Sequence, residues 1–150
     1  MLFQREFMMS LFLKHMPLGL FSGVVVVAIL FLTLYPHPLP EVEVPVFEWF
    51  DKVGHFFMFG GLCFAVSFDL RLAHVRGSVS APRRPWCRSL AVAFAAIVFG
   101  GVIELLQWVM ALGRTAEFAD FVADVLGALV FAFVSPVILP YIIRSKGALK

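Results

Sequence analysis

Long apolar runs divide the chain into four segments of membrane-spanning character. The runs cover about residues 17–35, 53–70, 89–112 and 118–143. They lack the period-2 alternation over about ten residues that a membrane β-strand would show. Helices are the other structure that satisfies every backbone polar group inside a bilayer. The pattern therefore predicts an all-α fold, a polytopic membrane protein built as a four-transmembrane-helix bundle.

The overall composition excludes a soluble globular protein. Of the 150 residues, 61% are hydrophobic and only 15% are charged. A soluble domain of this size needs a polar surface that so few charged side chains cannot supply. We therefore expect the lipid bilayer to be the main partner of the chain, and we expect no nucleic acid.

Basic residues are distributed unevenly between the connections. Ten of the twelve Lys and Arg residues precede the first run, separate the second from the third, or follow the fourth. Only Lys52 and Arg114 lie in the other connections. Because short loops rich in Lys and Arg stay in the cytoplasm, the distribution predicts a multi-pass protein of the cytoplasmic membrane with both termini inside.

This orientation also gives an expected domain organisation. Residues 1–16 form a cytoplasmic or interfacial segment, residues 17–143 the transmembrane domain, and residues 144–150 a cytoplasmic tail. The first run could instead be the core of a signal peptide, since Arg5 and Lys14 precede it. Its length of about nineteen residues and the absence of a small-residue cleavage pattern after it favour a retained helix.

Polar residues that membrane helices normally avoid gather toward the predicted outer side. They are Asp51, Lys52 and His55 around the outer end of the second span, Glu104 and Gln107 in the third, Arg114 in the turn, and Glu117, Asp120 and Asp124 around the start of the fourth. Residues three or four apart share a helix face, so three spans each present one polar face. Since a carboxylate at mid-depth costs roughly 2.5–3.5 kcal/mol, we expect these faces to meet around an outward-facing polar pocket.

Small residues suggest how the helices pack. The small-xxx-small pairs are Gly61 and Ala65, Ala96 and Gly100, and Ala123 and Gly127. Such pairs let membrane helices approach closely. We expect no matching polar cluster in the inner half, which favours a one-sided site over a channel.

The polar residues divide into candidate roles. His55, Glu104 and Asp124 are candidate catalytic residues, because facing carboxylates and a histidine can exchange protons with a ligand. The candidate substrate-binding residues are Asp51, Lys52, Gln107, Arg114 and Asp120, of which the two cations suit phosphate or carboxylate. Simpler interpretations are helix capping by Asp51 and Glu117, interfacial anchoring by Lys52, and a buried structural network.

A divalent metal is an open alternative. His55, Glu104, Asp120 and Asp124 offer the oxygen and imidazole ligands that Mg²⁺, Mn²⁺ or Zn²⁺ accept. The spacing does not require a metal, and the cofactor is left open.

The same residues resemble the VanZ-like family of small bacterial membrane proteins. The matching fragments are Asp51-Lys52-Val53-Gly54-His55, Glu104-Leu105-Leu106-Gln107, and Arg114 followed by Asp120, Asp124 and Gly127-Ala128, over about residues 51–130. Asp124 departs from the Asn that we expect at this position in many members, which changes the charge of the site. The resemblance implies an integral protein of the bacterial cytoplasmic membrane, sometimes linked to glycopeptide (teicoplanin) resistance, without an established reaction.

Three classes of function are compatible with these patterns. The first is binding or processing of a polar cell-envelope molecule, such as a lipid-linked glycan, a lipid head group or a cell-wall fragment. The second is ion- or proton-coupled transport, and the third is a structural or assembly role. The sequence leaves open whether the protein is an enzyme and whether it forms oligomers.

Overall fold

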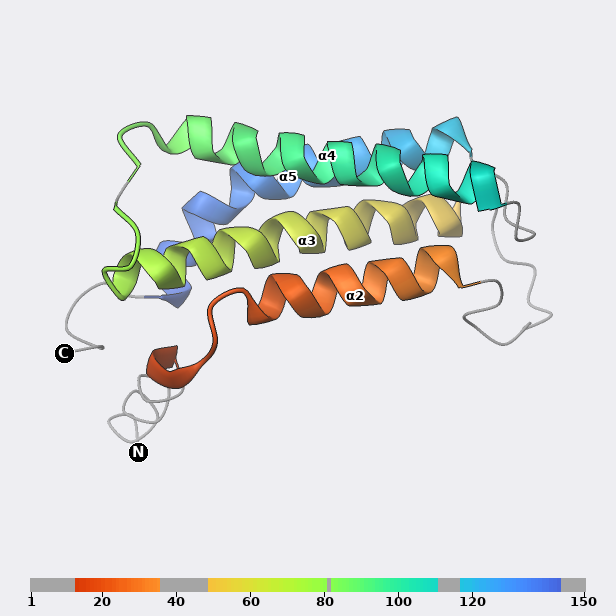
Figure 1. Ribbon diagram of the computed structural model, residues 1–150. Helices are drawn as coiled ribbons and strands as arrows, with labels where there is room; N and C mark the ends of the chain where they lie inside the picture. Colours follow the sequence, from red (N-terminus) through yellow and green to blue (C-terminus); the bar gives the residue numbers. More distant parts are fainter. Residues whose placement is uncertain (1–12, 36–48, 81, 111–116, 144–150) are drawn as a thin grey trace.

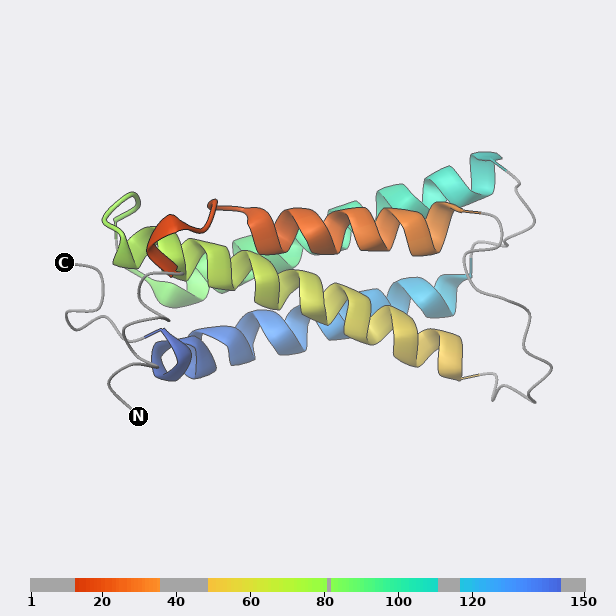
Figure 2. The same ribbon diagram turned by 90° about the horizontal axis from the view of Figure 1, so that it is seen from below.

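A computed structural model of the chain describes residues 13–35, 49–80, 82–110 and 117–143. Four long helices occupy most of these residues, and they contain no strand: α2 (Leu20–Leu34), α3 (Phe50–Val75), α4 (Pro85–Met110) and α5 (Phe118–Ile142). The helices run roughly alongside one another and alternate in direction (Figures 1 and 2). The predicted all-α fold is confirmed, with one helix for each apolar run.

Three of the helices meet the requirements for crossing a membrane. α3, α4 and α5 contain 26, 26 and 25 residues, and each is apolar enough for a span. At about 1.5 Å per residue they exceed the roughly 30 Å of a hydrocarbon core. α2 has 15 residues and is shorter than that thickness. A fourth membrane crossing by α2 therefore stays a prediction.

Two helices extend beyond the apolar runs from which the second and third spans were predicted. α3 continues to Val75 and α4 begins at Pro85, so Arg71 and Arg88 lie within helices rather than in the connecting loop. α3 ends in a Schellman motif, in which the N–H of Gly77 bonds to His74 O and the N–H of Ser78 bonds to Ala73 O. Gly77 takes a φ of 75°, which favours glycine. The helix thus ends where the backbone conformation ends it, several residues after Asp69 and Arg71.

Glycines let α5 approach α3 and α4. A Cβ on Gly127 would lie 2.1 Å from the backbone oxygen of Phe56, and a Cβ on Gly100 would lie 3.1 Å from Asp124 Oδ2. The packing role predicted for these two glycines agrees with the structure. The prediction for Gly61 is wrong, because a Cβ there meets nothing within 4 Å, whereas one on Gly60 would lie 2.5 Å from the Phe131 ring. Gly60 is thus the glycine at the close contact, while Ala65, the other member of the predicted pair, is buried.

An apolar layer fills the middle of the bundle. Phe59 and Cys63 of α3 are fully buried, and they cluster with Ile29 of α2, Ala96 of α4 and Ala128 of α5. Close packing of this kind holds the helices in fixed register. The layer separates two ends of different character: one where α3 begins and α4 ends, and one where α3 ends and α4 begins (Figure 1).

Candidate polar site at the start of α3

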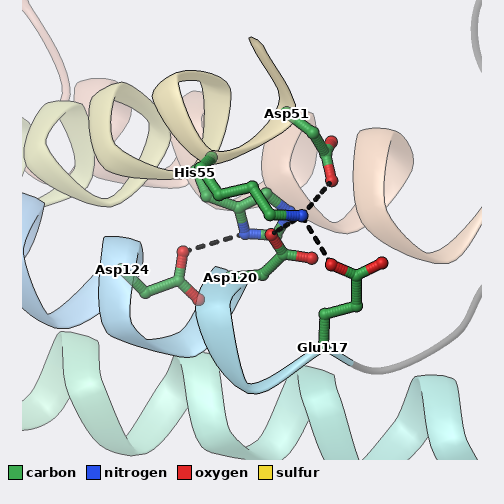
Figure 3. A network of polar contacts seen from close by, with 6 residues as sticks. Asp51, His55, Glu117, Asp120 and Asp124 are labelled. Atoms are coloured by element: carbon green, nitrogen blue, oxygen red, sulfur yellow. Dashed lines mark hydrogen bonds and ion pairs between the residues drawn. The ribbon is translucent and has the colours of Figure 1, made fainter. Parts of the chain in front are cut away.

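Lys52 lies at the centre of a group of carboxylates. Its Nζ atom is 2.6 Å from Glu117 Oε2, 2.9 Å from Asp120 Oδ1 and 3.8 Å from Asp51 Oδ2 (Figure 3). The side chains of Asp51 and Glu117 are about half exposed, whereas that of Asp120 is buried. Hydrogen bonding to the Lys52 ammonium holds the pKa of the Glu117 carboxyl below its ordinary value. The first turn of α3 is thus joined to the start of α5 by charge.

One helical turn further in, a histidine and a carboxylate form a buried pair. His55 Nδ1 lies 2.9 Å from Asp124 Oδ1, and the two side chains are only 3% and 2% exposed (Figure 3). His55 follows Asp51 by one turn of α3, and Asp124 follows Asp120 by one turn of α5. An ionised Asp124 accepts the hydrogen bond, so Nδ1 donates and the Nε2 lone pair is left for another partner.

α4 contributes a second carboxylate to this pair. Glu104, His55 and Asp124 each place one ligand-type atom within 4.8 Å of the other two. Gly100, one turn before Glu104, leaves space for the Asp124 carboxylate. The side chains described so far are referred to below as the polar cluster, which comprises Asp51, Lys52, His55, Glu104, Glu117, Asp120 and Asp124.

Comparison with known families identifies the chain. Residues 6–139 match the sequence model of the VanZ/LLP1 family. The chain belongs to this family. No curated protein and no solved structure matches the chain. The family match includes every fragment on which the VanZ-like resemblance was based, and it confirms that resemblance.

Of the other predicted site residues of this VanZ/LLP1 protein, only Gln107 is among the described residues, and it lies outside the polar cluster. Gln107 is buried, and its Nε2 donates a 2.9 Å hydrogen bond to Thr33 O near the end of α2. The amide thereby holds α4 against α2. Arg114 lies outside the described residues, as do the terminal segments 1–12 and 144–150. The predicted roles in substrate binding stay predictions for both residues.

The cluster contains two overlapping groups that could hold a metal ion. One comprises Asp51, His55 and Asp120, and the other comprises His55, Glu104 and Asp124. Lys52 Nζ lies on a carboxylate oxygen of Asp120 and would compete with a cation for the first group. The second group lies deeper and makes no ion pair with Lys52 among the described residues. Both groups offer one imidazole and two carboxylates, which suit Mg²⁺, Mn²⁺ or Zn²⁺, and only the first has a lysine ammonium on one of its ligands.

The sequence reasoning missed a buried carboxylate at the opposite end of α3. Asp69 is 7% exposed, and its Oδ2 accepts hydrogen bonds from the N–H and the hydroxyl of Ser22, at 2.9 and 2.7 Å. One buried carboxylate, bonded to one serine, therefore lies in the half of the bundle where no cluster matching the polar cluster was expected. The apolar pattern continues past Asp69 through Leu72 and Ala73, and that continuation could have placed Asp69 inside the helix.

Proposed function

We propose that the polar cluster binds, and transfers protons to or from, a polar molecule of the cell envelope. The observation that supports the proposal is the buried His55–Asp124 pair beside Glu104. Burying a histidine and a carboxylate in a membrane bundle, with a second carboxylate half-buried beside them, is costly, and such groups usually mark a ligand or ion site. The half-exposed carboxylates of Asp51 and Glu117 lead from the surface toward this pair.

Within this proposal each residue has a distinct role. Asp124 orients the His55 ring and stabilises its protonated form, as carboxylates do for histidine bases. His55 accepts or donates a proton through Nε2, and Glu104 is the second proton-transfer group. Lys52 fixes the relative positions of α3 and α5 through its ion pairs with Glu117 and Asp120.

The charge balance of the polar cluster limits the classes of ligand that could bind there. Five carboxylates face one lysine and one histidine among the described cluster residues. An excess of negative charge favours a ligand that presents an amine, or an anionic ligand that binds together with a divalent cation. Of the candidate envelope molecules, amino-bearing cell-wall fragments and lipid head groups fit this balance best.

Isosteric substitutions test this function. Plasmid-encoded wild type is compared with His55→Gln, Asp124→Asn and Glu104→Gln in a bacterial host. Teicoplanin susceptibility and envelope-lipid composition are measured together with membrane protein level. Asp69→Asn is the matched control, because it neutralises a buried carboxylate outside the cluster. We expect wild type to change teicoplanin susceptibility or envelope-lipid composition. Each cluster variant should lose that change at normal protein level, and the control should retain it.

Two results would contradict the proposal. If all three cluster variants keep the full effect at normal abundance, the cluster does not act on an envelope molecule. If the effect falls only in proportion to the amount of folded protein, the cluster has the structural role of a buried network.

A bound divalent cation is a specific form of this proposal, supported by the group of His55, Glu104 and Asp124. Elemental analysis of the purified protein tests it. About one equivalent of metal in wild type and a loss of that metal in Glu104→Gln are expected. A metal content that is negligible in wild type, or equal in the two proteins, argues against it.

Ion- or proton-coupled transport is the second candidate, since acidic and histidine side chains within membrane helices often line ion paths. The filled apolar layer around Phe59 and Cys63 lies between the two ends of the bundle and argues against a path through a single chain. Counterflow in proteoliposomes that is abolished by Glu104→Gln would favour transport over the first proposal.

A further inference from the structure

We propose that Arg71 and Arg88 form a second site, which binds the phosphate group of a membrane lipid at the end of the bundle opposite the polar cluster. The two arginines line a cleft of about 240 Å³ between the end of α3, the start of α4 and the end of α5. Ser67, His74, Ser89 and Pro140 also line it. We refer to it as the arginine cleft.

The guanidinium groups have donors without acceptors. Arg71 Nε and Arg88 Nη1 are buried, and neither has a hydrogen-bond partner among the described residues. Arg71 Nη2 makes one long hydrogen bond, 3.4 Å to Ile143 O. Leaving a charged donor buried and unsatisfied is unfavourable. An anionic acceptor in the cleft would satisfy both groups.

The charges of the two arginines also call for an anion. Both guanidinium groups line the same cleft, so their like charges repel each other. No carboxylate in the described part of the chain lies within ion-pair distance of either arginine. A phosphate accepts hydrogen bonds from several guanidinium N–H groups at once. Its negative charge would attract both arginines and offset their mutual repulsion.

The rest of the lining supplies suitable hydrogen-bond donors. Ser67 and Arg71 lie one turn apart on α3, and Arg88 and Ser89 lie in adjacent positions near the start of α4. The start of α4 adds the partial positive charge of a helix N-terminus. The cleft therefore combines two guanidinium groups with hydroxyl donors from two helices.

An apolar groove indicates that the phosphate belongs to a lipid. The groove has a volume of about 380 Å³, and Arg88 and Val92 line both the groove and the arginine cleft. Leu62, Val66 and Ala95 are among its other lining residues. A head group in the cleft would thus place an acyl chain along an adjoining apolar surface. Free phosphate would use the cleft alone.

The position along the bundle agrees with this ligand. Basic residues predict that this end faces the cytoplasm, where anionic lipids attract Lys and Arg. Basic sites between membrane helices commonly bind such head groups.

Lipid binding to the full-length protein in neutral detergent provides the test. Native mass spectrometry measures the affinity for phosphatidylglycerol, for diacylglycerol, which lacks the phosphate, and for inorganic phosphate. We expect phosphatidylglycerol to bind at least about tenfold more tightly than diacylglycerol, and Arg71→Gln/Arg88→Gln to lose about tenfold in that affinity. The matched control is Arg83→Gln/Arg84→Gln, which removes the same charge from exposed positions outside the cleft. It should keep the wild-type affinity.

A second variant keeps the test decisive if the double variant folds poorly. Ala95 is exposed and lines the groove, so Ala95→Trp fills the groove without changing charge. We expect it to weaken phosphatidylglycerol binding severalfold. Equal losses in the cleft and control variants, or equal binding of the two lipids, overturn the proposal. Binding of inorganic phosphate without preference for phosphatidylglycerol overturns the lipid assignment.

Discussion

At the scale of single residues, the Lys52–Glu117 ion pair has a definite electrostatic consequence. The 2.6 Å contact lowers the pKa of Glu117 from its ordinary value near 4.5. Because the pKa is lowered in the folded protein, the pair's stabilisation is present above the ordinary pKa and is lost as pH falls through the lowered one. Glu117 is half exposed, so solvent screening keeps this contribution small.

Substitution of the lysine tests the electrostatic origin of this shift. Lys52→Met should raise the pKa of Glu117 back toward its ordinary value, as measured by a pH titration of the labelled carboxyl carbon by NMR in micelles. Lys14→Met is the control: Lys14 follows Leu13, whose backbone oxygen accepts a hydrogen bond from Arg76 at the far end of α3, so the titration should be unchanged. An unchanged Glu117 titration in Lys52→Met would show that the pKa has another cause.

Some of the residue-scale organisation could be predicted from the sequence. The spacing of Asp51 and His55 placed them on one face of α3, because a helix repeats every 3.6 residues. The partner of each group could not be predicted in this way. Lys52 makes its closest ion pairs with α5 rather than with the neighbouring Asp51, since the partner depends on where α5 lies across the helix interface.

At the scale of helices, Gly127 fixes the contact between α3 and α5. A Cβ at this position would meet the backbone oxygen of Phe56 at 2.1 Å, and backbone cannot move aside as a side chain can. Gly127→Ala should therefore destabilise the protein by about 1–3 kcal/mol, as overpacked sites do. Gly61→Ala is the matched control, since it adds the same methyl group in open space on α3. Unfolding in a detergent mixture measures both.

The two alanines are expected to act in opposite directions. Alanine is about 0.5–1 kcal/mol more favourable than glycine in a helix, so Gly61→Ala should be neutral or slightly stabilising. Equal stability of the two variants would mean that α3 and α5 do not meet closely at Gly127.

Asp69 caps α2 from a different helix. The N–H of Ser22 lies in the first turn of α2, where it has no acceptor in its own helix, and the Asp69 carboxylate accepts its hydrogen bond. Asp69→Asn should weaken this cap and the interaction with the α2 dipole by about 1 kcal/mol. The expected result is faster hydrogen exchange at the start of α2, while exchange in α5 stays unchanged.

Ser22→Ala provides a graded comparison. It removes the hydroxyl hydrogen bond and keeps the backbone one, so it should accelerate exchange less than Asp69→Asn. An equal or larger effect of Ser22→Ala would show that the backbone cap contributes little.

The number and order of the helices could be predicted from the apolar runs, but the residues at which they begin and end could not. Arg71 and Arg88 lie between the second and third apolar runs, yet both are within helices. Long helices can extend beyond the hydrocarbon region, where arginine is a good helix former. Gly77 ends α3 through its positive φ, and Pro85 is the first residue of α4. Both act through the backbone, so a hydrophobicity pattern does not show them.

At the scale of the whole molecule, the bundle has two chemically different ends. Carboxylates with one lysine and one histidine occupy the end where α3 begins, and Arg71 and Arg88 occupy the other. The apolar layer around Phe59 separates them. Such a separation lets each end bind its own ligand, so substitutions at one end should leave binding at the other unchanged.

The direction of this asymmetry across the membrane is open to a chemical test with the two native cysteines. Cys87 is exposed near the start of α4, and Cys63 is buried in the apolar layer. The basic residues predict that Cys87 faces the cytoplasm. A membrane-impermeant maleimide should therefore label the protein in inside-out vesicles and leave it unlabelled in intact spheroplasts. Cys87→Ser should abolish the labelling, because Cys63 is inaccessible.

A cysteine at the other end completes the topology test. Trp49 is 70% exposed and immediately precedes α3, so Trp49→Cys in the Cys87→Ser background places one accessible thiol next to the polar cluster. It should react in intact spheroplasts, because the predicted orientation puts this end outside. Labelling of Cys87 from outside, or of Trp49→Cys only from inside, would reverse the orientation. The polar cluster would then face the cytoplasm, and a ligand from the outer leaflet could not reach it.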